Sequence, residues 1–135
     1  MLALFDTNIY IGDLADAIPG EQTQAWRAQY ILRLSPVVFH ELLRGTREPH
    51  LIEEIGKKTI LTAAPTAKMW KEGAQILRKF TSQYGFGEEV FKLQNDILIA
   101  LTARHIGAVV ITQDGHFADI AKIVPYHYIH YRRPH

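Results

Sequence analysis

Short apolar runs alternate with longer helix-like segments along this chain, and this alternation restricts the folds that it can adopt. The runs have the length of strands, and they span 2–5, 30–34, 60–63, 108–112 and 126–131, although 30–34 can also continue the helix before it. Strands that alternate with helices in this way usually pair in a parallel sheet on which the helices pack. The sequence therefore predicts an α/β fold with a central, mostly parallel sheet flanked by helices.

The segments between the apolar runs carry signals for helix starts and ends. The expected helices span 7–17, 21–29, 36–43, 49–58, 65–83, 88–105 and 114–123. Thr7 or Asn8 can cap the first helix, and Ser35 followed by Pro36 is the clearest start of any. Residues 84–87, Tyr-Gly-Phe-Gly, are expected to separate the two longest helices.

Length and composition place the chain among ordinary globular proteins. Its 135 residues fit a single domain, 1–135, and its apolar fraction of 47% is sufficient for a real core. A net charge of +1 gives no global attraction to nucleic acid or membrane, and the absence of cysteine excludes disulfides and thiolate-bound zinc. Because the first apolar run begins at Leu2 and no stretch is long enough to span a bilayer, we expect a cytoplasmic protein without a membrane partner.

Four acidic residues follow or interrupt apolar runs, where a carboxylate is unfavourable unless something compensates it: Asp6, Glu41, Asp96 and Asp114. Asp6 and Asp114 come directly after expected strands, and the carboxyl ends of parallel strands are where active residues collect. Glu41 and Asp96 lie on expected helices that can face the same crevice. The four carboxylates are therefore candidates for one site.

Each acid also has a purely structural explanation. Asp6 and Asp114 can cap the helices that follow them, and for either residue alone capping is the favoured interpretation. Glu41 can be a solvated helix residue with Arg44, three positions later, as an ion-pair partner.

Asp96 can likewise pair with Lys92 or Arg104 on an exposed helix face. Taken together, however, the four acids favour a site, because two unit charges about 5 Å apart repel by roughly 3 kcal/mol at an effective dielectric near 20. A whole domain is stable by only about 5–15 kcal/mol. A cluster of four carboxylates thus predicts a bound cation or a shared proton.

Carboxylate oxygens select hard cations, so Mg²⁺ or Mn²⁺ is the expected cofactor. Such ions activate a water molecule and neutralise charge on a phosphodiester during in-line attack. The four acids therefore indicate nuclease chemistry.

These residues stand in motifs that resemble those of the PIN-domain nucleases. The four motifs are Phe5-Asp6-Thr7-Asn8, His40-Glu41-Leu42-Leu43-Arg44-Gly45, Asn95-Asp96-Ile97-Leu98-Ile99-Ala100 and Ile111-Thr112-Gln113-Asp114-Gly115-His116-Phe117. Any one of them is weak, but the four in register across nearly the whole chain are fairly specific. The small size of the chain is similar to that of the VapC-type toxins of bacterial and archaeal toxin–antitoxin pairs.

The resemblance implies a PIN-like domain with Mg²⁺- or Mn²⁺-dependent endoribonuclease activity, an RNA substrate, a homodimeric state and inhibition by a cognate antitoxin protein. Asp6, Glu41, Asp96 and Asp114 match the acidic quartet of the family. Of these, Asp6, Asp96 and Asp114 are expected to ligate the metal, and Glu41 to ligate it or position the attacking water. Three further positions are expected to support the site, and they are Asn8, Thr112 and Arg44.

Some details stay open at this point. Arg44 can orient Glu41 or hold a phosphate. Gly115-His116 follows Asp114 where some family members place another acid or Asn, so the number of metal ions is not fixed. His116 itself is expected at the surface or in a supporting role.

The aromatic residues on or near helices can belong to the core, a dimer surface or an antitoxin groove, and they include Trp26, Tyr30, Trp70 and Phe80. The segment 126–133 can stack bases or form an edge strand with a basic tail, and the edge strand is the favoured interpretation. The alternative functions are a catalytically silent RNA- or protein-binding module of the same fold and a housekeeping RNA-processing nuclease.

Overall fold

The computed structural model describes the backbone of residues 1–84 and 88–133 and the side chains of residues 1–80 and 89–133. Within these residues a five-stranded sheet has the order β3-β2-β1-β4-β5, and every neighbouring pair is parallel. The strands are β1 (Leu2–Phe5), β2 (Ile31–Leu34), β3 (Ile60–Leu61), β4 (Val109–Thr112) and β5 (His127–His130). The predicted α/β fold with a parallel sheet is confirmed, and β5 is an edge strand, as the favoured interpretation has it.

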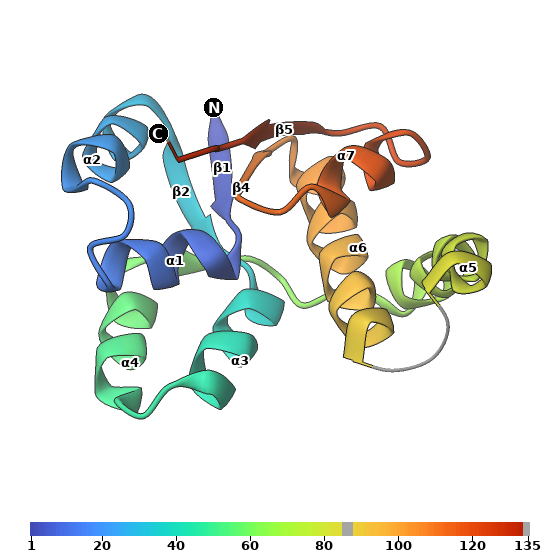
Figure 1. The fold of residues 1–135 in the computed structure, drawn as a ribbon, viewed down its shortest axis with the longest axis horizontal. Helices are drawn as coiled ribbons and strands as arrows, with labels where there is room; N and C mark the ends of the chain where they lie inside the picture. Colours follow the sequence, from blue (N-terminus) through green and yellow to red (C-terminus); the bar gives the residue numbers. More distant parts are fainter. Residues whose placement is uncertain (85–87, 134–135) are drawn as a thin grey trace.

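The helices are α1 (Thr7–Leu14), α2 (Gly20–Gln29), α3 (Pro36–Gly45), α4 (Pro49–Lys58), α5 (Ala67–Tyr84), α6 (Glu88–Ile106) and α7 (His116–Ala121). Figure 1 shows α2 and α4 to the left of β1, α1 and α3 below it, and α5 to α7 to the right. Ser35 caps α3 as predicted, since its side chain accepts the N–H of Val37 at 3.2 Å. A break was predicted over 84–87, and residues 85–87 of it lie outside the described residues.

The helix α1 begins as one of the two interpretations of the sequence has it and ends earlier than predicted. Its cap is Asp6, whose Oδ1 accepts the N–H of Thr7 at 2.8 Å, and not Thr7 or Asn8. It ends at Leu14 instead of residue 17, because the amides of Ala17 and Ile18 both donate to the carbonyl of Gly12. Asp16, which lies between the end of α1 and Ala17, adopts a positive φ of 55°, which a right-handed helix cannot continue through.

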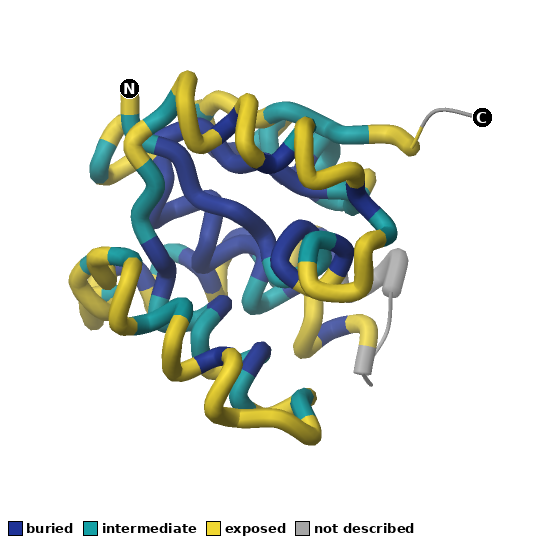
Figure 2. The backbone as a smooth tube through the Cα atoms, turned by 90° about the vertical axis from the view of Figure 1, so that its left-hand side faces the viewer, coloured by how far each residue is buried: buried dark blue, intermediate teal, exposed yellow. Residues whose placement is uncertain are grey.

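The central strands and the middle of α6 form the core. Figure 2 shows the buried part of the chain running through the centre, with exposed helix faces around it. Ala3 to Phe5 and Val109 to Ile111 are all buried, as is usual for parallel strands covered on both faces. In α6 the run 97–101 is buried all round, so this helix passes through the interior and carries its neighbour Asp96 with it.

The aromatic residues that the sequence leaves undecided divide between core and surface. Trp26 and Phe80 are buried, Tyr30 is partly buried, and Trp70 is 47% exposed. Among the described residues, none of the helices combines the length and the apolar character needed to span a membrane.

Gly107 ends α6 in a left-handed conformation, with a φ of 69°, and an added Cβ would meet no atom within 4 Å. We expect Gly107→Ala to lower the free energy of unfolding by about 1–2 kcal/mol through backbone strain alone. Gly20→Ala is the matched control, because that site is equally open but has no positive φ. Chemical denaturation measures both, and equal effects of the two substitutions would contradict the strain.

Candidate metal centre

The pairing of β1 with β4 brings the loops that carry Asp6 and Asp114 together. The strands run side by side in register, with Phe5 opposite Ile111, and the N–H of Asp6 donates to the carbonyl of Ile111 at 2.9 Å. Asn8 joins the two loops, since its Oδ1 accepts the N–H of Gln113 at 3.0 Å and its carbonyl accepts Nε2 of Gln113 at 3.1 Å. These bonds hold the start of α1 against the loop after β4.

Thr112 links the two carboxylates through one hydroxyl. Its Oγ1 donates to Oδ2 of Asp6 at 2.8 Å and accepts the N–H of Asp114 at 2.9 Å. The side chain is fully buried, so water does not compete for these bonds. The hydroxyl therefore holds the orientation of Asp6 and the position of Asp114 at the same time.

Asp96 reaches the same place from α6. It is only 2% exposed, and its Oδ2 accepts no hydrogen bond among the described residues. Nδ1 of His116 lies 3.6 Å from that oxygen and 3.4 Å from Oδ1 of Asp114. Asp96, Asp114 and His116 each offer one ligand atom, and these three atoms all lie within 4.8 Å of one another.

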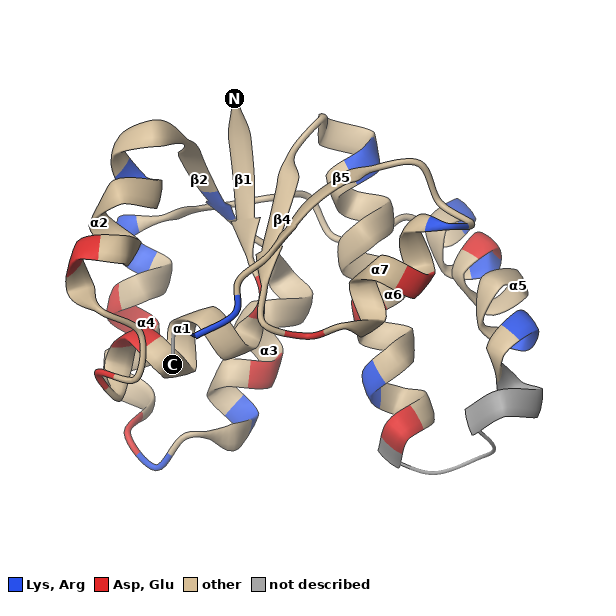
Figure 3. Ribbon diagram, turned by 45° about the horizontal axis from the view of Figure 1, so that its top comes forward, with Lys and Arg blue, Asp and Glu red and all other residues tan. Residues whose placement is uncertain are grey.

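Glu41 lies at the edge of the cluster. It is partly buried on α3, and its Oε1 accepts the hydroxyl of Thr7 at 2.9 Å. Figure 3 shows acidic segments of α3, α6 and the loop after β4 near the carboxyl end of β1. The fold thus gathers the four predicted acids, with Asp6, Asp96 and Asp114 inside and Glu41 at the rim.

Burial and mutual repulsion disfavour the charged forms of the two innermost acids. Burial is the main cause that raises the pKa of Asp6 to about 6, with help from the charges of Glu41 and Asp114 and against the hydrogen bonds from Thr112 and Thr7. Burial likewise raises the pKa of Asp96 to about 7, although His116 beside it acts in the opposite direction. Without a cation, these two acids keep their protons to near neutral pH.

Asp114 has the opposite character. Burial disfavours its charge, but the N–H of His116 and the ammonium of Lys92 outweigh burial and hold its pKa below the usual value. Nζ of Lys92 lies 3.0 Å from Oδ2 of Asp114. The same carboxylates raise the pKa of His116, through Asp96 first and then Asp114. Positive charge from Lys92 and His116 thus offsets part of the negative charge.

The structure corrects several interpretations of single residues. Asp96 is not on an exposed face: Arg104 binds Glu72 with two hydrogen bonds of 2.8 and 2.6 Å, and Lys92 binds Asp114. Capping by Asp6 is real, and it coexists with the place of Asp6 in the cluster.

Two further side chains of the centre, Thr7 and Lys92, were not predicted as members of it. His116 was expected at the surface or in a supporting role, and it is partly exposed and lies beside Asp96 and Asp114. Lys92 precedes Asp96 by four residues, and this spacing places both on one helix face, which is the signal that could have found it. Arg44 is exposed, and among the described residues no ion pair joins it to Glu41. The hydrogen-bond partner of Glu41 is Thr7.

The raised pKa values make the stability of the metal-free protein depend on pH. Because Asp6 and Asp96 hold protons more tightly when folded, their contribution is complete below about pH 4 and is lost as pH rises through about 6 to 7. In chelator, we expect the free energy of unfolding to fall by roughly 4 kcal/mol between pH 5 and 7.5. Denaturant titrations at the two pH values measure this difference.

Asp96→Asn should reduce that fall, since an amide has no charge to bury. Asp119→Asn, at an acid that is 43% exposed beside Lys122, is the control and should leave the fall unchanged. An undiminished fall in Asp96→Asn would show that this carboxyl group is not its source.

Comparisons with known proteins agree with this geometry. The model of the PIN domain family matches residues 3–123, whereas the comparison with curated proteins found no match. Among solved structures, VapBC-1 from nontypeable Haemophilus influenzae is similar with a TM-score of 0.66 and 19% identity, over 96% of this chain and 97% of that chain.

Two further structures are similar. VapBC2 from Rickettsia felis, bound to a DNA fragment from the promoter, has a TM-score of 0.63 and 19% identity over 96% of this chain and 98% of that chain. FitAcB from Neisseria gonorrhoeae has a TM-score of 0.55 and 20% identity over 93% of this chain and 95% of that chain. At these identities the structures support the fold, and the family match goes further: this chain belongs to the PIN domain family, as its four acidic motifs predicted.

Proposed function

We propose that this protein is a metal-dependent endoribonuclease that hydrolyses RNA phosphodiester bonds and serves as the toxin of a type II toxin–antitoxin pair. Membership of the PIN domain family supports nuclease chemistry. The observation that carries the proposal is the convergence of the acids: oxygens of Asp96 and Asp114 lie within 4.8 Å of each other, Thr112 joins Asp6 to Asp114, and Glu41 lies at the rim. Such a cluster is unfavourable in a metal-free protein and favourable around a cation.

The residues present fit a hard divalent cation. Asp6, Asp96 and Asp114 would hold it, and the buried Oδ2 of Asp96 is an acceptor without a hydrogen bond among the described residues. Carboxylate oxygens favour Mg²⁺ or Mn²⁺. When bound, such an ion lowers the pKa of water and neutralises charge on a phosphodiester.

The other polar residues position the carboxylates. Thr112 orients Asp6, and the amide of His116 fixes Oδ1 of Asp114 at 2.9 Å. Thr7 holds one oxygen of Glu41 and leaves the other open, so the partly buried Glu41 can accept a hydrogen bond from the attacking water. We assign Glu41 this role at the rim.

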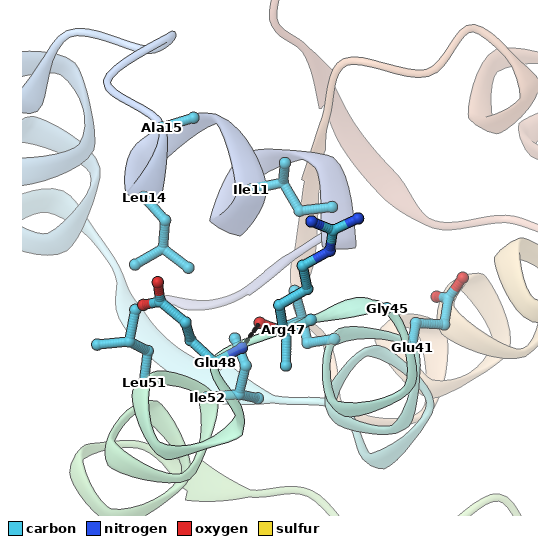
Figure 4. A pocket seen from close by; sticks show the side chains of 11 residues that line it. Ile11, Leu14, Ala15, Glu41, Gly45, Arg47, Glu48, Leu51 and Ile52 are labelled. Atoms are coloured by element: carbon cyan, nitrogen blue, oxygen red, sulfur yellow. Dashed lines mark hydrogen bonds between the residues drawn. The ribbon is translucent and has the colours of Figure 1, made fainter.

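The antitoxin partner is proposed from the similar structures and from a pocket beside Glu41. VapBC-1 and FitAcB are named as complexes of two components, and this chain resembles them along almost its whole length. Figure 4 shows Ile11 and Leu14 of α1 facing Leu51 and Ile52 of α4, with Glu41 on the α3 side.

This pocket has a volume of about 390 Å³, and Ile11 and Leu14 at its edge are 54% and 49% exposed. Apolar side chains of an antitoxin segment can fill it and so hold that segment beside the carboxylates. A homodimer is proposed with it, as the family resemblance implies.

The first test is cleavage of a single-stranded RNA in Mg²⁺ or Mn²⁺. Asp6→Asn and Asp96→Asn should each lower the rate at least about 100-fold, since each removes a ligand charge, and a chelator should stop the wild type. Asp119→Asn is the control and should cleave normally, because Asp119 contacts Lys122 and not the cluster. Wild-type rates in a folded Asp6→Asn protein would refute the assignment.

The second test concerns Thr112 and reads metal binding instead of activity. Thr112→Val keeps the shape but removes the hydroxyl that holds Asp6 and Asp114, so the affinity for Mn²⁺ should fall about 10- to 100-fold. Thr102→Val is the matched control, since this buried hydroxyl bonds only the carbonyl of Leu98 within α6. Calorimetric titration measures both, and equal affinities of the two variants would exclude the orienting role.

A further inference from the structure

Two adjoining grooves lie between α3 and the start of α6, next to the carboxylate cluster. One has a volume of about 460 Å³ and is lined by Glu41, Arg44, Phe91, Lys92 and Asn95. The other, of about 380 Å³, shares Arg44, Phe91 and Asn95 and extends to Trp70. Because they share three lining residues, we treat them as one surface and call it the α3–α6 groove.

We propose that the α3–α6 groove binds a single strand of RNA, with Lys92 and Arg44 on its phosphates and Phe91 and Trp70 stacked on its bases. The inference rests on the proposed nuclease function and adds the surface that would lead the strand to the carboxylates. None of these four side chains belongs to the acidic quartet, although Lys92 also pairs with Asp114.

The groove is continuous with the carboxylate cluster. Lys92 lines it and also lies 3.0 Å from Oδ2 of Asp114, and Glu41 lines it and also binds Thr7. A strand lying in the groove would therefore have one phosphodiester close to the acids.

The two cations come from different helices. Arg44 is exposed on α3, and the side chain of Lys92 on α6 is 56% exposed although it pairs with Asp114. An ammonium has three donors, so Lys92 can keep the carboxylate and still bind a phosphate oxygen. The planar fork of Arg44 suits a phosphate as well. Cations from two helices of one groove match the repeated negative charge of a nucleic acid strand.

The aromatic side chains are unusually exposed for their size. Phe91 is 67% exposed and Trp70 is 47% exposed, although burying such a ring would stabilise the fold by roughly 1.5–3 kcal/mol. Exposed rings beside cations are the pattern that stacks unpaired bases. Bases of a duplex are already stacked and paired, so these rings favour a single strand.

A second copy of the chain is the competing occupant of this apolar surface. In a two-fold contact centred on the groove, Arg44 and Lys92 of one copy would approach those of the other. Like charges held close together repel, whereas the phosphates of RNA attract the same cations. The charges therefore favour RNA, and self-association is an outcome of the test.

The experiment measures binding without cleavage. The full chain carrying Asp96→Asn is titrated against a labelled single-stranded oligonucleotide and against the duplex of the same length, by fluorescence anisotropy at several salt concentrations. Tighter binding of the single strand is expected. Phe91→Ala and Trp70→Ala in this background should each weaken it by about 10-fold, with the salt dependence unchanged.

The cations should show the opposite signature. Lys92→Ala and Arg44→Ala should each reduce the slope of log K against log salt by about 0.7, the amount expected for one lost phosphate contact on a single strand. Lys58→Ala is the matched control, since Lys58 is exposed and lines a different pocket with Arg27 and Arg33. Its slope should equal that of the parent.

Phe91→Leu separates stacking from apolar contact, because Leu keeps an apolar surface but has no ring. Full RNA affinity in Phe91→Leu would overturn the inference. A Phe91→Ala variant that binds RNA normally but sediments differently would also overturn it, in favour of a contact between copies of the chain. If the wild type cleaves RNA but the groove variants bind RNA normally, the inference is overturned and the proposed nuclease function stands. Groove-dependent binding by a wild type that never cleaves would support the inference and refute the nuclease.

Discussion

The burial of several carboxylates beside one another is the constraint on which the rest of this structure depends. Asp6 and Asp96 are almost inaccessible to water, and burial raises the pKa of Asp6 to about 6 and that of Asp96 to about 7. A domain with about 5–15 kcal/mol of stability cannot hold three such charges without compensation. Lys92 and His116 supply part of it in the metal-free protein, and a divalent cation would supply the remainder.

The fold tolerates this arrangement because apolar burial on every side holds the carboxylates in place. Asp6 continues a central strand, Asp114 follows the strand next to it, and Asp96 adjoins a stretch of α6 that is apolar all round. The hydroxyl of Thr112 then fixes the distance between the two loops. Moving one acid away would disturb the sheet or the core. The unfavourable burial of the carboxylates therefore persists in the metal-free protein, and binding of a cation would relieve it.

The sequence was sufficient for the sheet, most helices and the convergence of the four acids, because apolar runs, caps and strand ends are local signals. It was insufficient for contacts between distant segments. Nothing local distinguishes Lys92 pairing with Asp114 from Lys92 pairing with Asp96, and nothing local places His116 between two acids. The early end of α1 was missed for a different reason: the contact is local, but no residue in this stretch signals that the amides of Ala17 and Ile18 turn back to the carbonyl of Gly12.

A groove with cations and exposed rings beside a buried acidic cluster gives a consistent physical account of a nuclease, in which one region holds a strand and the other a metal. The most direct test of that account is anomalous diffraction from crystals soaked in Mn²⁺ at neutral pH. The account predicts a peak in contact with the carboxylates of Asp6, Asp96 and Asp114. Well-ordered crystals in which Mn²⁺ is absent from these side chains, or is bound only elsewhere, would contradict it.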